Sequence, residues 1–121
     1  MNKTEHNKQI ALKWVKAFNE HDIEKLLELY SEDAVHYSPK LKVRHPETNG
    51  WVAGKAALRN WWVEAFKRLP SLHYQLENLI INDKQLLMEY LRQVEGEDEI
   101  MIAEILETED NLIVRSRVYH G

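Results

Sequence analysis

The stretch Ser31–Trp62, SEDAVHYSPKLKVRHPETNGWVAGKAALRNWW, interrupts the regular patterns on either side of it. It opens with a strand-like run, Ala34–Ser38, which ends at Pro39 because proline has no amide hydrogen for a sheet ladder. A polar loop of about fourteen residues follows, and a loop of that length inside a compact domain is typically functional or disordered. Because the loop carries Trp51, we expect it to fold over a site.

The composition is that of a globular protein. The 121 residues are 44% apolar and 30% charged, and no repeat or low-complexity tract divides them. We therefore expect a single domain over residues 1–121. No run approaches the roughly 20 apolar residues of a membrane span, and the amino terminus lacks the apolar core of a signal peptide. We expect a soluble, cytoplasmic protein that does not act on membranes.

Charge and cysteine content disfavour several kinds of site. The net charge is −4 and the basic residues are scattered, which disfavours a nucleic-acid partner. The absence of cysteine removes disulfides, thiol nucleophiles and thiolate metal sites. His36, His120 and Glu104 resemble a two-histidine, one-carboxylate metal set in type only, because no local ligand spacing supports one. We predict no metal and no cofactor.

Three helical patterns are predicted around the opening stretch. The first covers residues 4–21, and the second begins after Asp22, a candidate N-cap. The third begins near residue 55, has the cleanest helical period in the chain, and ends before Pro70. It carries Trp61 and Trp62 side by side. Since successive helical residues turn by about 100°, we expect only one of the two to face a pocket.

The rest of the chain has the period of strands. Some of the runs are apolar on both faces, as expected if one sheet face packs on helices and the other on a second subunit. Helices that pack on one face of a mainly antiparallel sheet define an α+β fold. The four runs, separated by hairpin-turn residues, are Leu72–Ile81, Gln85–Val94, Glu99–Leu106 and Leu112–His120.

This order of elements resembles the nuclear transport factor 2-like superfamily, and within it the SnoaL-like and ketosteroid-isomerase-like branch. The resemblance implies a cone-shaped roll of three helices on a curved sheet, an apolar pocket inside it, and a homodimer formed through the sheet. It rests on four stretches in the expected order: Trp14–Asp22, Leu29–Val35, Gly54–Leu58 and Leu112–His120.

The catalytic residues of that branch do not carry over to this sequence. The isomerases' tyrosine oxyanion donor aligns with Trp14, and their aspartate base aligns with Ser38. Their aspartic acid falls near Ile102 or Ala103, and the last-strand aspartate of the SnoaL-like cyclases aligns with Val118. We therefore do not expect ketosteroid isomerisation by that mechanism, and the cyclase mechanism lacks its general acid/base.

Two histidines remain as candidate catalytic residues. If Ser38 and Val118 face the pocket, the strand period places His36, Ser116 and His120 on the same face. A histidine near its ordinary pKa of about 6.5 serves as acid or base at neutral pH. We predict that His36 transfers a proton and that His120 is the complementary acid or second base. The alternative is a structural His36 and a solvated His120 at the chain end.

The remaining candidates would bind the substrate. Glu104 is a further pocket acid or the partner of a cross-strand ion pair with Arg92, Arg115 or Arg117, and the ion pair is the favoured interpretation because an isolated buried charge is costly. Glu89 poses the same question. The predicted substrate-binding residues are Trp14, Phe18, Ser38, Trp51, Trp62, Phe66, Ser116 and Val118.

These features support two classes of function. The first is a SnoaL-like enzyme that transfers protons on a small, largely apolar carbonyl compound, as in isomerisation, cyclisation or dehydration. The second is a non-catalytic domain of the same fold that binds a small apolar organic ligand or another protein. In both cases we expect a homodimer through the sheet, and neither nucleic acid nor membrane as a partner.

Overall fold

The computed structural model describes residues 2–120, and it confirms the predicted α+β fold. Helices and strands follow one another along the chain much as the hydrophobic periods indicate. Their bounds are α1 (Lys3–Asn19), α2 (Ile23–Leu27), β1 (Tyr30–Tyr37), α3 (Pro39–Arg44), a 3-10 turn (Pro46–Thr48), β2 (Trp51–Ala53), α4 (Lys55–Arg68), β3 (His73–Ile81), β4 (Gln85–Gln93), β5 (Ile100–Glu109) and β6 (Leu112–His120).

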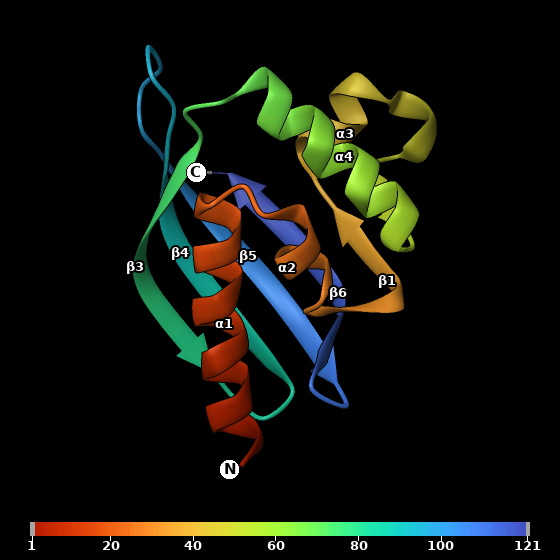
Figure 1. Ribbon diagram of the computed structural model, residues 1–121, viewed down its shortest axis with the longest axis vertical. Coiled ribbons are helices and arrows are strands. Elements are labelled where there is room, and N and C mark those ends of the chain that lie inside the picture. The colour runs from red at the N-terminus through yellow and green to blue at the C-terminus, as the bar shows by residue number, and fades with distance from the viewer. Residues whose placement is uncertain (1, 121) are drawn as a thin grey trace.

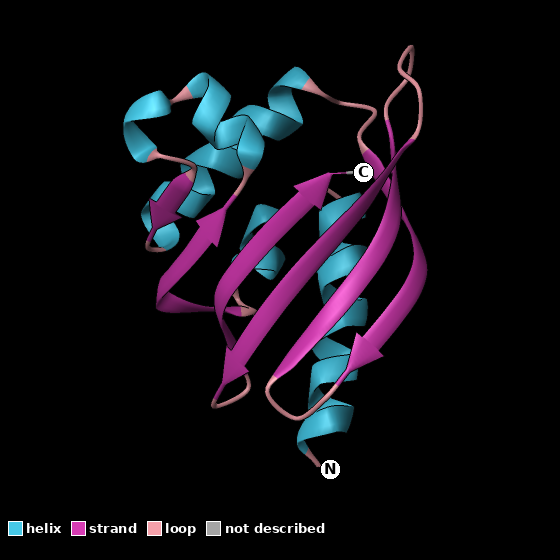
Figure 2. Cartoon of the chain, turned by 180° about the vertical axis from the view of Figure 1, so that it is seen from behind, coloured by secondary structure: helices cyan, strands magenta, loops and turns pink. Residues whose placement is uncertain are grey.

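The strands form one curved, six-stranded sheet in the order β2-β1-β6-β5-β4-β3. Neighbouring strands are antiparallel except β1 and β6, which are parallel. Figure 2 looks onto the outer face of this sheet, with α1 and α2 behind it. The sheet therefore has one face toward the helices and one face away from them.

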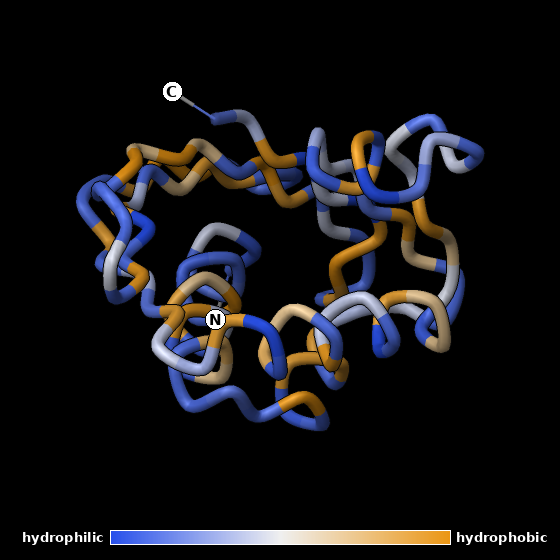
Figure 3. Tube along the Cα trace, turned by 90° about the horizontal axis from the view of Figure 1, so that it is seen from above, coloured by the Kyte–Doolittle hydropathy of each residue, from blue (hydrophilic) through white to orange (hydrophobic). Residues whose placement is uncertain are grey.

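The helices close the concave face of the sheet. In Figure 1, α1 lies across this face and α4 crosses the end of the molecule at which β6 ends. One stripe of α1, which includes Ile10, Trp14 and Phe18, is buried against the sheet. Seen end-on in Figure 3, the sheet bends around an interior that the helices complete from the other side. This arrangement leaves the core between two layers.

The predicted loop after β1 is an ordered segment. Ser38 caps α3, its hydroxyl accepting from the amide of Lys40 at 3.3 Å, and Pro39 occupies the first turn, where proline is well tolerated. The Ser38 amide donates to the carbonyl of Gly50 at 2.9 Å, which ties the far end of the segment back to β1. The segment then runs into β2, so it becomes part of the sheet edge.

The hairpin turns fall where the sequence predicts them. The side chain of Asn82 accepts hydrogen bonds from the amides of Lys84 and Gln85, which closes the turn between β3 and β4. Asp110 and Asn111 join β5 to β6 with positive φ angles of 51° and 64°, as a two-residue hairpin turn requires. None of the helices in the described chain has the length and apolar character to cross a bilayer.

Candidate functional site

A cavity of about 70 Å³ lies between the concave face of the sheet, α1 and α4. Its inner wall is aromatic and apolar, with a few polar side chains set into it. The lining residues are Trp14, Phe18, His36, Ser38, Lys40, Trp61, Trp62, Ala65, Arg68, Leu69, Leu72, Tyr74, Tyr90, Arg92, Ile102, Glu104, Val118 and His120.

Most of the predicted site residues meet in this cavity. Trp14 and Phe18 come from α1, His36 from β1, and Val118 and His120 from β6, while Ser38 follows β1 and Trp62 lies on α4. Trp61 also lines it, so the expectation that one of the two adjacent tryptophans faces elsewhere is wrong. Because α4 crosses the cavity, an arc of the helix wide enough to include both side chains faces it.

Three predicted substrate-binding residues do not line the cavity. Trp51 is 39% exposed and pairs with Tyr37 across β1 and β2, with ring centroids 5.3 Å apart. That pair lies on the sheet face opposite His36. Trp51 therefore does not face the cavity, which corrects the prediction that it binds the substrate. Phe66 packs edge-on against Phe18 at 5.0 Å, and Ser116 lies beneath His36; both support the wall from behind.

His36 is a buried, neutral histidine. Its side chain is 3% exposed and its Nδ1 lies 2.6 Å from the Oγ of Ser116. Burial lowers the pKa of His36 to about 4, because no nearby negative charge offsets the loss of hydration of the imidazolium. The ring is therefore uncharged at neutral pH. It can exchange hydrogen bonds with a ligand, but it is a weak base.

Glu104 is the carboxyl group for which the sequence left open a place in the pocket or in an ion pair, and favoured the ion pair. It is 2% exposed, lines the cavity from β5, and accepts a hydrogen bond from the hydroxyl of Tyr90 at 2.7 Å. Burial raises the pKa of Glu104 to about 8, and the Tyr90 hydrogen bond offsets only part of that effect. Mostly protonated at neutral pH, this group can both donate and accept a proton.

The predicted ion pair of Glu104 is wrong. Arg92 pairs with Glu97 at 2.9 Å, Arg117 pairs with Glu107, and Glu104 has no cationic partner among residues 2–120. The reason is the register, because Glu104 faces Met88 and Val118 on the inner face. Glu89, with the opposite facing, accepts a hydrogen bond from the Asn78 amide at 3.0 Å rather than forming the predicted ion pair.

Tyrosines surround this carboxyl group. The rings of Tyr74 and Tyr90 stack with centroids 4.1 Å apart, and the hydroxyl of Tyr30 accepts from Trp14 Nε1 at 2.9 Å. Burial, followed by the nearby Glu104, raises the pKa of all three tyrosines above the ordinary range. They remain protonated and can donate hydrogen bonds. Strand alternation places Tyr90 and Glu104 on the same face, a signal that the sequence analysis did not use.

The mouth of the cavity is cationic. Lys40, Arg68, Arg92 and His120 line both the cavity and an adjoining outer groove of about 480 Å³. Partial burial, with the positive charges of Lys40 and Arg92, lowers the pKa of His120. Within residues 2–120, no group of three histidine, aspartate or glutamate side chains is arranged to hold a metal ion.

Comparisons with known proteins agree with this fold. The sequence profile of one protein family, described as a SnoaL-like domain, matches residues 11–116. No curated protein matches the chain. A SnoaL-like protein of unknown function from Burkholderia thailandensis superposes with a TM-score of 0.86 at 21% identity, covering 97% of this chain and 95% of that one.

Two further solved structures share the fold. A Kribbella flavida protein proposed to be a ketosteroid isomerase superposes with a TM-score of 0.81 at 18% identity, covering 100% of this chain and 82% of its own. TerC, co-crystallised with polyporic acid, superposes with a TM-score of 0.82 at 16% identity, covering 96% and 92%.

Proposed function

The chain belongs to the SnoaL-like domain family, and we propose that its cavity transfers protons on a small carbonyl compound. Glu104 is the acid/base, and His36 holds the carbonyl oxygen. The observation that carries the proposal is a buried carboxyl group, with a pKa of about 8, in the wall of an aromatic cavity. General acid/base catalysis is most efficient when the pKa of the group lies near the working pH.

In this proposal His36 donates a hydrogen bond and does not abstract the proton. The N–H of Trp14 can only donate, and it donates to the Tyr30 oxygen, so the proton of Tyr30 points elsewhere. The Oγ of Ser116 lies 2.6 Å from His36 Nδ1. If the Ser116 hydroxyl donates to Nδ1, Nε2 carries the hydrogen. A neutral donor of this kind polarises a carbonyl without itself losing a proton.

The remaining predicted residues take supporting parts. Trp14, Phe18, Trp62 and Val118 form apolar walls that exclude water, which strengthens each hydrogen bond inside. Ser38 contributes a hydroxyl beside His36, although that hydroxyl is already engaged in capping α3. His120 lies at the mouth and not at the inner end. The proposal therefore assigns proton transfer to Glu104 and no catalytic part to His120.

The experiment follows enolisation directly. The protein is incubated in D₂O with cyclohexanone, acetophenone and levulinate, and exchange of the α-protons is followed by proton NMR. We expect saturable exchange with at least one ketone, and we expect Glu104→Gln to slow it by about a hundredfold or more. The glutamine can still accept from Tyr90, so ligand binding should persist.

Glu89→Gln is the matched control, because it makes the same substitution on the neighbouring strand, on the outer face of the sheet. It should exchange like the wild type. Exchange at the buffer rate in the wild type for every ketone, or equal loss in both variants, would overturn the proposal.

The second candidate function is ligand binding without catalysis. It is favoured by one observation, the serine at position 38 where the related isomerases have their base, which leaves Glu104 as the single carboxyl group among the lining residues that the structure describes. Binding of a ketone that shows no exchange would select this function.

A further inference from the structure

The mouth of the cavity gathers more positive charge than its own carboxylates neutralise. Lys40 is on α3, Arg68 ends α4, and Arg92 lies near the end of β4; all three line both the cavity and the outer groove, and Arg44 lines the groove. These elements converge at the end of the molecule where α4 leads toward β3 (Figure 1). In sequence the cations are far apart, and only the fold brings them together.

Two of these cations have carboxylate partners and two do not. Arg44 lies 3.7 Å from Glu64, and Arg92 lies 2.9 Å from Glu97. Lys40 and Arg68 form no ion pair with any residue of the described range 2–120. The mouth therefore holds two unneutralised positive charges beside an apolar cavity.

Arg68 also has an unused hydrogen-bond donor. Its Nε is buried and finds no partner among the described residues, which is costly for a guanidinium N–H. Arg92 is 6% exposed, so its charge is held away from solvent. A buried donor without an acceptor, beside a nearly buried guanidinium, is the arrangement expected of a site that awaits an anionic acceptor.

The cations also act on one another. Partial burial, and then the charges of Arg92, Arg68 and Arg44, lower the pKa of Lys40. Hydrogen bonding from Arg92 lowers the pKa of Glu97, with Lys40 and Arg68 adding to the effect. Both shifts have the direction that a positive potential at the mouth produces.

We propose that this mouth, formed by Lys40, Arg68 and Arg92, binds the carboxylate of the ligand whose carbonyl end enters the cavity. This inference rests on the proposed function for the carbonyl end, and it narrows the ligand to an oxo acid. The inner cavity of about 70 Å³ takes only a small group, whereas the groove of about 480 Å³ outside it takes the remainder. A carboxylate bound at the mouth stays partly hydrated, and the ketone end of the same ligand then extends into the cavity.

The test compares charged and uncharged ligands of the same shape. Levulinate and its longer methyl-ketone homologues are each paired with the primary amide, and affinities are measured by calorimetry on both the wild type and Glu104→Gln. We expect at least one acid to bind about tenfold more tightly than its amide, the size of one charge-assisted hydrogen bond. Higher ionic strength should reduce the preference, because salt screens partly exposed charges.

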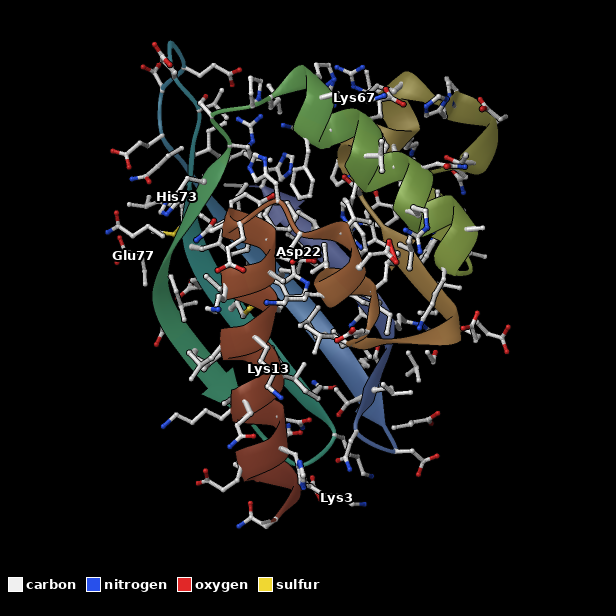
Figure 4. The ribbon with its side chains drawn as sticks, in the orientation of Figure 1. Lys3, Lys13, Asp22, Lys67, His73 and Glu77 are labelled. Carbon is white, nitrogen blue, oxygen red and sulfur yellow. The ribbon has the colours of Figure 1, made fainter. Side chains whose placement is uncertain are left out.

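Variants of α4 test whether Arg68 causes the preference for the acid over the amide. Arg68→Gln should remove most of the acid-over-amide preference, and Arg68→Lys should restore part of it. Lys67→Gln is the matched control: Lys67 is the preceding residue on the same helix, is exposed (Figure 4), and carries the same charge. Equal melting temperatures would show that the variants fold.

Each outcome separates this inference from the proposed function. Acids that bind no better than their amides, or a preference that Lys67→Gln reduces as much as Arg68→Gln does, would overturn the anionic mouth. Proton exchange on neutral ketones but not on the oxo acids would also overturn the anionic mouth, while leaving the acid/base proposal in place. A charge preference without exchange would support the mouth and contradict the catalytic role of Glu104.

Discussion

At the scale of single residues, His36 provides a direct test of its hydrogen bond with Ser116. Because burial lowers its pKa to about 4, we expect its ring nitrogen signals to stay unchanged between pH 5 and pH 8 in nitrogen-15 NMR. The shifts should be those of a neutral ring protonated on Nε2. A transition centred near pH 6.5, or the Nδ1–H form, would contradict a neutral His36 that accepts from Ser116.

Glu104 makes a prediction about stability. Its pKa is about 8 in the folded state against 4.5 in the unfolded chain, so the folded state holds the proton more tightly. The stabilisation is complete below pH 4.5 and is lost as pH rises toward 8, by up to about 5 kcal/mol in the free energy of unfolding. His36, whose pKa is lowered by burial, adds stability as pH rises toward 6.5 in all three proteins, so the loss is read as a difference: in urea titrations the wild type and Glu89→Gln should lose that stability relative to Glu104→Gln. Parallel curves for all three proteins would show that Glu104 is not the cause.

At the scale of elements, the segment between β1 and β2 depends on a glycine. Gly50 has φ +93°, and a Cβ atom there would lie 2.6 Å from Cε1 of Tyr37. Gly96 has φ +84° with nothing within 4 Å, so it shares the backbone strain without the clash. We expect Gly50→Ala to lower the free energy of unfolding by about 1–3 kcal/mol more than Gly96→Ala does, in urea unfolding. Equal losses would show that the close approach to Tyr37 costs nothing.

At the scale of the whole molecule, the outer face of the sheet is the predicted dimer interface. Ile80, Met101 and Tyr119 are exposed at 60%, 44% and 46%. Strand alternation places them on this outer face, because the neighbours Ile102, Val118 and His120 line the inner cavity and Ile80 pairs with Leu87 on the same face. Figure 2 looks onto this face. In sedimentation velocity we expect a dimer for the wild type and a monomer for Met101→Lys, because a charge in an apolar interface is costly. Val43→Lys, which introduces the same charge on α3, is the control and should remain a dimer. A wild type that sediments as a monomer at micromolar concentration would contradict the interface.

Local sequence determined the helices, the turns and the strand facing. The spacing of apolar residues predicted α1, α4 and β3 to β6, because the burial of one helix stripe or one strand face depends on residues close together in the sequence. Asp22 predicted the start of α2 as an N-cap. Pro39 predicted only the end of the preceding strand, and the helix α3 that begins there was expected to be loop. The alternation that placed His36 with Ser38 and Val118 with His120 also held, since it depends only on strand geometry.

The tertiary structure decided what those side chains meet. Trp51 does not line the cavity, because β2 pairs at the sheet edge and the Trp51 ring lies on the same face as Tyr37. Glu104 became a cavity acid because register placed it opposite Met88 and Val118, away from any arginine partner. The convergence of Lys40, Arg68 and Arg92 follows from how α3, α4 and β4 pack. Such contacts join residues far apart in the chain, so their distances and burial arise only when the sheet curves and the helices close it.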